Sequence, residues 1–173
     1  MSLMRLSLIF TIIGIIGITA HVEFNNVKCS TKSPDFLNFE YCFLKSINRT
    51  YKYLSIKCHF SQLPITNAWM TYKVIKRDSR NIFERFNATI DVCKFMKDRG
   101  NQLANIIFNA FADYTNINHT CPLNHDVILE KLPVQHVNNM VGNIFPNGRY
   151  ILNLTYYISH IPRSEVIVYL TKS

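Results

Sequence analysis

The feature that most constrains this sequence is a pair of cysteines, Cys93 and Cys121, that bracket one helical pattern in a chain otherwise patterned as β-strands. Between them, apolar residues recur at spacings of three and four over about residues 101–114, so they share one helical face. These residues are Leu103, Ile106, Ile107, Ala110 and Phe111. We therefore expect a β protein with a single inserted helix.

Outside this stretch, apolar and polar residues alternate with the period of two that is typical of half-buried strands. About eight such segments follow one another, separated by turn signals such as Pro146-Asn147-Gly148. Their spacing predicts a mainly β, two-sheet sandwich, with residues 21–173 forming one domain. The inward faces of such a sandwich are either packed solid or enclose a cavity, and the period alone does not decide between them.

The first residues have the layout of a secretory signal peptide. Arg5 precedes an apolar run from Leu6 to Ile18, and the small residue Ala20 follows. As a membrane anchor, the run is short of the roughly 20 apolar residues that a span requires. We expect residues 1–20 to be removed and the protein to be secreted, with a signal anchor as the alternative.

N-glycosylation sequons independently favour secretion, because their motif is used in the secretory pathway. The four sequons begin at Asn48, Asn87, Asn118 and Asn153. Any sequon that is used must face solvent, so we expect these asparagines on the surface of a glycoprotein.

Five cysteines in a secreted chain predict two disulfides and one free thiol. The sequence alone leaves the pairing open. We expect Cys29 to pair with Cys42 and Cys93 with Cys121, because each pair closes a local unit. Cys58 is then the free thiol.

The chain carries a formal net charge of +8, and its basic residues are scattered except for one cluster. The cluster consists of Lys73, Lys76, Arg77, Arg80 and Arg85. A solvated hairpin loop is the favoured interpretation, and an anionic partner or surface is the alternative. Nucleic acid is not expected as a partner, because secreted proteins rarely meet it.

Motifs of the common catalytic sites are missing from the sequence, including G-x-S-x-G, H-E-x-x-H and G-x-x-x-x-G-K. The densest polar cluster is His119, Cys121, His125 and Asp126. Its side chains are of the types that bind zinc, but Cys121 is expected in a disulfide and Asn118 would place a glycan at the site. We expect a structural turn here, with no catalytic residues, no metal and no cofactor.

Several segments of the chain resemble one known family. They are Val27-Lys28-Cys29, Tyr41-Cys42, Leu44–Tyr51, Ile90–Phe95, Asn116–Pro122, Asn124-His125-Asp126, and Arg163 with Val166, Val168 and Tyr169. The family is a large insect family of secreted proteins with a domain of unknown function. The chemosensory CheB proteins are its relatives, and it is distantly similar to the ganglioside activator and the ML lipid-recognition domains.

This resemblance implies an immunoglobulin-like, ML-like β-sandwich whose sheets part to admit a lipid or another apolar ligand. No catalytic residues come with it. Cys58 departs from the cysteine pattern of the family, which agrees with its being unpaired.

We therefore expect a secreted, non-enzymatic binding protein for a lipid or other apolar small ligand, with a role in chemosensation. The alternative is an extracellular protein-interaction module or co-receptor with a solid core. A membrane receptor and an anionic surface are further candidate partners. Expected cavity-wall residues are Phe39, Phe43, Leu54, Ile56, Ile107, Phe111, Leu152, Leu154 and Tyr156. Ordinary core packing is the alternative role for each, and the helix is expected as the lid of the cavity or as a plug.

Overall fold

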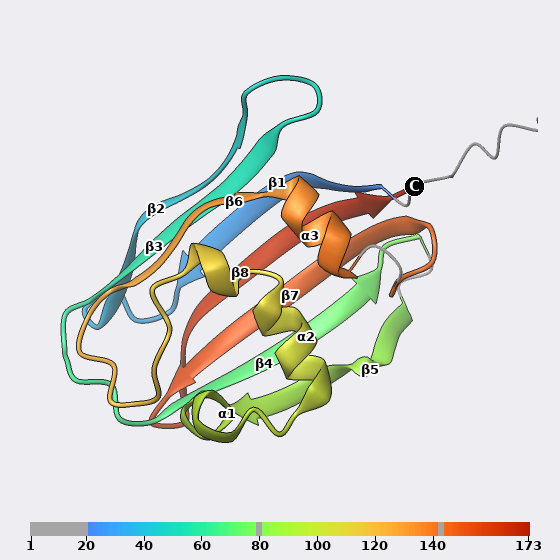
Figure 1. Ribbon diagram of the computed structural model, residues 1–173. Coiled ribbons are helices and arrows are strands. Elements are labelled where there is room, and N and C mark those ends of the chain that lie inside the picture. Colours follow the sequence, from blue (N-terminus) through green and yellow to red (C-terminus); the bar gives the residue numbers. More distant parts are fainter. Residues whose placement is uncertain (1–20, 79–80, 142–143) are drawn as a thin grey trace, which may run out of the picture.

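The computed structural model describes residues 21–78, 81–141 and 144–173, which form two antiparallel sheets packed face to face (Figure 1). This confirms the predicted mainly β, two-sheet architecture. The expected signal peptide, residues 1–20, lies outside the described residues, as does Arg80 of the basic cluster.

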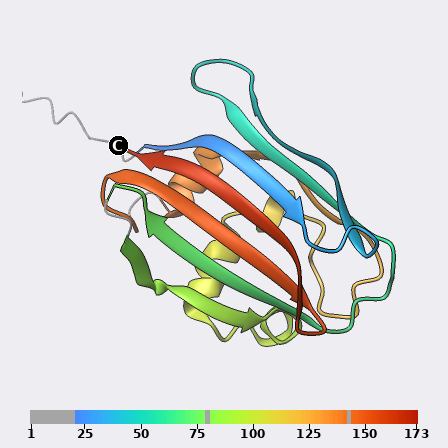
Figure 2. The same cartoon turned by 180° about the vertical axis from the view of Figure 1, so that it is seen from behind.

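The larger sheet has the strand order β1-β8-β7-β4-β5 and the smaller sheet has the order β2-β3-β6. The strands of the larger sheet are β1 (Val22–Thr31), β8 (Ile161–Lys172), β7 (Gly148–Ile158), β4 (Ala68–Lys76) and β5 (Asn81–Asp91). Those of the smaller sheet are β2 (Leu37–Ser46), β3 (Lys52–Phe60) and β6 (Val127–Pro133). Figure 2 shows that the helices of the described residues all lie behind the larger sheet, so they leave its outer face uncovered.

Alternation along the strands determines which side chains lie between the sheets. In β8, Ser164, Val166 and Val168 are buried, and their neighbours are only partly buried. In β7, Tyr150 is 1% exposed, and the partly buried Leu152 and Leu154 pack against the same core. The inner face of the larger sheet is therefore a nearly continuous apolar surface.

The strand β2 departs from simple alternation because it contains a β-bulge. Phe39 pairs with Cys58 of β3, but the next pair is Tyr41 with Lys57, so Glu40 is an extra residue. A bulge of one residue exchanges the two faces of the strand that follows it. Accordingly, Phe39 packs in the core before the bulge, and Cys42 and Leu44 do so after it. For this reason, the expectation that Phe39 and Phe43 both line the cavity was wrong for Phe43.

One edge of the sandwich is closed covalently. A disulfide joins Cys29 of β1 in the larger sheet to Cys42 of β2 in the smaller sheet, with a Cα–Cα distance of 6.2 Å. A second disulfide joins Cys93 to Cys121, and Cys58 is a buried free thiol. These pairs are the ones that the sequence predicts.

The opposite edge, between β5 and β6, is covered by helices rather than by strand pairing (Figure 1). The helices in the described part of the chain are α1 (Val92–Asp98), α2 (Gln102–Asn109) and α3 (Val134–Val141), and a 3-10 helix spans Ala112–Tyr114. Only α2 and the 3-10 helix fall within the predicted helical range. Helices α1 and α3 were not predicted, so the expectation of one helix was incomplete.

Side-chain caps explain where α1 and α2 begin. The Asp91 carboxylate accepts a hydrogen bond from the backbone N–H of Lys94 at 2.9 Å, and Asn101 accepts one from Ala104 at the same distance. Such caps satisfy backbone donors that have no partner within the helix. The cap at Asp91 lies at the last residue of β5, so α1 begins at the next residue, Val92.

Candidate functional site

The two sheets and the helices line a cavity of about 300 Å³. Its wall is contributed by both sheets and by α1 and α2, and nearly all of the side chains on it are apolar. A water molecule occupies about 30 Å³ in the liquid, so the space is larger than a few waters need. It lies at the lower end of the range of small-molecule sites, which is about 300–1,000 Å³.

Most of the sequence-predicted wall residues come together around this cavity. Those on its wall are Phe39, Leu54, Ile56, Ile107, Phe111, Leu152, Leu154 and Tyr156. They come from three different strands and from the helical segment, so the fold brings together residues that are far apart in sequence.

Phe43 is the predicted residue that lies elsewhere. It follows the bulge at Glu40, so its side chain projects from the outer face of the smaller sheet and is 40% exposed. There its ring packs against Tyr41 and Tyr53, at centroid distances of 5.8 and 6.3 Å. Its assignment to the cavity wall is corrected for that reason.

The helical segment supplies wall residues that the sequence did not indicate. Ala104 and Phe108 are buried and line the cavity beside Ile107. Ile106 does not lie on the wall, so the inward face of α2 is rotated from the predicted one. The predicted pattern gave Ile106 the same weight as Ile107, because a short helix defines its apolar face poorly.

Arg99 joins the two helices over the cavity. It adopts a left-handed conformation, with φ of 54°, and its backbone N–H caps α1 on the carbonyl of Phe95. Its guanidinium lies 3.9 Å from the ring centroid of Phe108 and 5.0 Å from that of Phe95. Cation–π stacking of this kind fixes α1 against α2.

Tyr156 places a phenol on the wall of the cavity. Burial raises the pKa of its phenol, with the nearby Cys58 adding to the rise. The residue nevertheless keeps part of its surface accessible, as expected for a side chain that faces an internal space. Among the described residues, its hydroxyl has no hydrogen-bond partner, so it is available to a molecule in the cavity.

Cys58 also lines the cavity and is 8% exposed. Burial, with a smaller effect from the charge of Asp126, raises the pKa of its thiol to about 12. Because the thiolate is the reactive form, this thiol is a poor nucleophile near neutral pH. Its surroundings are those of a packed wall residue.

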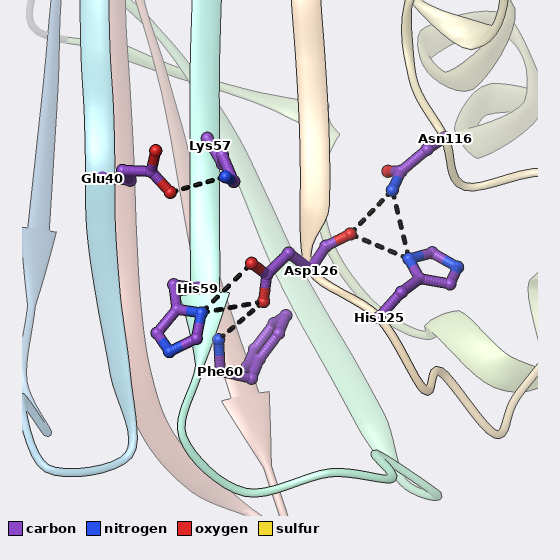
Figure 3. Close-up of polar contacts among 7 residues, drawn as sticks. All are labelled: Glu40, Lys57, His59, Phe60, Asn116, His125 and Asp126. Atoms are coloured by element: carbon purple, nitrogen blue, oxygen red, sulfur yellow. Dashed lines mark hydrogen bonds and ion pairs between the residues drawn. The ribbon is translucent and has the colours of Figure 1, made fainter.

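A polar network lies outside the cavity, where the ends of β3 and β6 meet (Figure 3). The Asp126 carboxylate lies 3.1 Å from Nδ1 of His59 and accepts a hydrogen bond from the backbone N–H of Phe60 at 3.2 Å. Asn116 donates to the carbonyl of Asp126 at 2.7 Å and accepts from the N–H of Ile128 at 2.8 Å. The network thus ties the loop after the 3-10 helix to the smaller sheet.

The predicted polar cluster of His119, Cys121, His125 and Asp126 separates into different contacts. His119 and His125 approach each other with their Nε2 atoms 2.9 Å apart, whereas the Asp126 carboxylate faces His59 and Cys121 is in a disulfide. Within the described ranges, no group of three or more His, Cys, Asp or Glu side chains is arranged to hold a metal ion.

The sequon asparagines lie away from the cavity wall. Asn48, Asn87 and Asn118 are exposed, and Asn153 is partly buried. The amide nitrogen of Asn153 donates to Glu165 at 2.8 Å, so that contact must break before a glycan can be attached.

Comparison with known proteins identifies one family. Residues 70–152, just under half of the chain, match the model of a family described as "Protein of unknown function (DUF1091)". The match supports the predicted similarity to a family with a domain of unknown function, and it includes the helical segment between Cys93 and Cys121. No curated protein matches the chain.

Over the parts of the chain that the structure describes, none of the helices combines the length and the apolar character needed to cross a membrane.

Proposed function

We propose that this protein is a secreted, non-enzymatic binding protein that holds a lipid or another apolar small molecule between its sheets. The observation that carries the proposal is the apolar cavity of about 300 Å³. Burying apolar surface contributes roughly 25 cal/mol per Å², so such a wall favours an apolar ligand over water. The two disulfides support an extracellular location, because they persist in oxidising compartments.

The wall has few polar groups, and this defines what the site can do. Cys58 is a buried, weakly acidic thiol, and the phenol of Tyr156 offers one hydrogen bond. Among the described residues, no hydrogen bond joins either group to a histidine or a carboxylate that could act as its general base. These features support binding as the role of the cavity. The finer proposal of a chemosensory role rests on the resemblance to the CheB proteins and the ML domains.

The test is recovery and uptake of an apolar ligand. Protein secreted from eukaryotic cells is extracted with organic solvent for mass spectrometry, and delipidated protein is titrated with a fluorescent fatty acyl probe. We expect a stoichiometric lipid in the extract and saturable uptake of the probe. Absence of both would contradict the proposal.

A matched pair of variants locates the binding. Leu154→Trp places an indole in the cavity and should weaken probe binding by about tenfold or more. Phe43→Ala removes a ring from the outer face of the smaller sheet and should leave the affinity unchanged. Equal affinities of the two variants would mean that the probe binds outside the cavity.

A second candidate function is an extracellular protein-interaction module or co-receptor. The outer face of the smaller sheet carries an aromatic cluster of Tyr41, Phe43, Tyr51 and Tyr53, with neighbouring ring centroids 5.8 to 6.3 Å apart. Phe43 and Tyr51 are 40% and 39% exposed. Exposed aromatic side chains are typical of protein interfaces. Loss of cell-surface binding in Phe43→Ala, with unchanged probe uptake, would favour this function.

A further inference from the structure

A lysine side chain lies at one end of the cavity, next to the last residues of β8. Lys172 continues the inward row of β8 after Val166 and Val168, lines the cavity, and is only 8% exposed. Lys172 is an even number of residues from Val166 and Val168, so the alternation of β8 alone could have identified it as an inward residue.

A second lysine lies close to the same end. Lys76 ends β4, in the inward row that contains Met70 and Val74. Gly148, the backbone partner of Lys172, makes room for it: a Cβ atom on Gly148 would lie 2.8 Å from Cε and 3.5 Å from Nζ of Lys76. The φ angle of 151° at Gly148 also disfavours other residues. Lys76 therefore crosses the inner face of β7 toward the neighbour of Lys172.

These two ammonium groups have little compensation from the protein. The Nζ atom of Lys172 has one long contact, 3.4 Å, to the side-chain oxygen of Asn147. Among the described residues, neither lysine forms an ion pair with a carboxylate. The carboxylate of Asp78 is engaged by Arg149, with 2.9 Å between Nε and the carboxylate, and Lys76 has only a weaker charge effect on it.

A cation in an apolar wall is costly unless a counter-charge or a strong hydrogen bond compensates for its lost hydration. An anionic group placed at the end of the cavity would supply both, through charge-assisted hydrogen bonds from the ammonium groups. Arg149 and Arg77 lie in the same region, and a backbone hydrogen bond joins them at 2.8 Å. Their charges add to a positive potential at this end.

We propose that Lys172, assisted by Lys76, binds the anionic head group of an amphiphile whose apolar chain occupies the cavity. A long-chain carboxylate is the simplest ligand of this class. From Ser164 to Lys172 the strand rises through eight residue steps, or about 26 Å at the usual rise, so the wall can follow an extended chain. This inference rests on the proposed function, because it names the class of ligand that the same cavity holds.

The test compares a long-chain fatty acid with its methyl ester, each titrated against delipidated protein by displacement of a neutral fluorescent acyl probe. The wild type should bind the acid about tenfold more tightly than the ester, as expected for one charge-assisted hydrogen bond. In Lys172→Met, affinity for the acid should fall to that for the ester, and affinity for the ester should not change. Lys73→Met, an exposed lysine of β4, is the matched control and should behave as the wild type.

The outcomes separate this inference from the proposed function. If the wild type and Lys172→Met bind acid and ester equally well, the lysine site is overturned and the apolar cavity stands. If neither compound binds, both are overturned. Displacement of the fatty acid by equimolar acetate would mean that the site takes a free anion rather than an amphiphile, and would also overturn the inference. If Lys172→Met does not fold, the affinities of the wild type and of Lys76→Met for the acid and the ester still test the inference.

Discussion

Asp126 is a single residue that links two neighbouring strands of the smaller sheet, β3 and β6. Burial alone would raise the pKa of its carboxyl group, but the hydrogen bonds from His59 and from the N–H of Phe60 outweigh this effect. The charges of His59 and Lys57 act in the same direction, so the pKa lies below its usual value. The carboxylate therefore stabilises the junction of β3 and β6 in its charged form.

This arrangement predicts a pH-dependent contribution to stability. Because the folded-state pKa of Asp126 is below the unfolded value of about 3.9, its contribution is present above that pH and is lost as the pH falls through the folded value. Asp126→Asn should lower the free energy of unfolding by about 1–2 kcal/mol at neutral pH, and the difference should shrink in acid. Urea unfolding between pH 7 and pH 2 measures it.

The control for this experiment is Asp113→Asn, an exposed aspartate of the 3-10 helix. Its free energy of unfolding should follow that of the wild type at every pH. A constant difference between Asp126→Asn and the wild type across the whole range would show that the charge of Asp126 is not what stabilises the junction.

At the scale of elements, the alternating strands were predictable because each has one face in the core. The bulge in β2 was not predictable, because the sequence around Glu40 alternates as it would in a regular strand. The extra residue shows only in the pairing with β3, which a single segment does not reveal. Most of the cavity wall could therefore be predicted, but Phe43 could not be placed.

Helices α1 and α3 were missed for a different reason. Each has fewer than nine residues, too few to be stable alone, and each follows a strand directly. Their stability comes from packing: Phe95 of α1 is buried against Phe108, and Val134 and Val137 of α3 are buried in the main core. The Asp91 cap of α1 was the available signal, but the alternation of Ile90 and Val92 concealed it.

The Cys93–Cys121 disulfide should hold the helical cover over the cavity. It closes a loop with a sequence separation of 28, which corresponds to about 3–4 kcal/mol in the chain-entropy model. Replacing both cysteines by serine should lower the free energy of unfolding by roughly that amount. Hydrogen exchange should accelerate in α1 and α2 more than in β7 and β8, and the fluorescent probe should dissociate faster.

The Cys29–Cys42 disulfide provides the comparison, because its sequence separation is only 13 and it closes the opposite edge. Removing it should cost less stability, by about 0.7 kcal/mol on the same entropy model, and should leave exchange in α2 unchanged. Equal exchange in α2 for both double variants would argue against a specific role of Cys93–Cys121 in the cover.

At the scale of the whole molecule, the two edges of the sandwich are closed in different ways, one by a disulfide and the other by helices. The disulfide between β1 and β2 holds the sheets together on one side, and α1, α2 and the 3-10 helix separate β5 from β6 on the other (Figure 1). Helix α1 contacts β4 and β5, the 3-10 helix contacts β6, and neither extends a sheet. The helices hold the two sheets apart at this edge, and the short helical segment does not fill all the space between the sheets. The space that remains is the cavity.

A ligand in such a space should stabilise the entire fold, because it binds the native state alone. At a free concentration of 100 times its Kd, a ligand adds about 2.7 kcal/mol, which raises the Tm by about 5–10 °C in a domain of this size. Delipidated protein should show this shift with a long-chain fatty acid in scanning calorimetry. Leu154→Trp should show little or none at the same concentration, because its cavity is filled. A shift of equal size in Leu154→Trp would instead place the stabilising contact on the outer surface, where the cavity has no part in it.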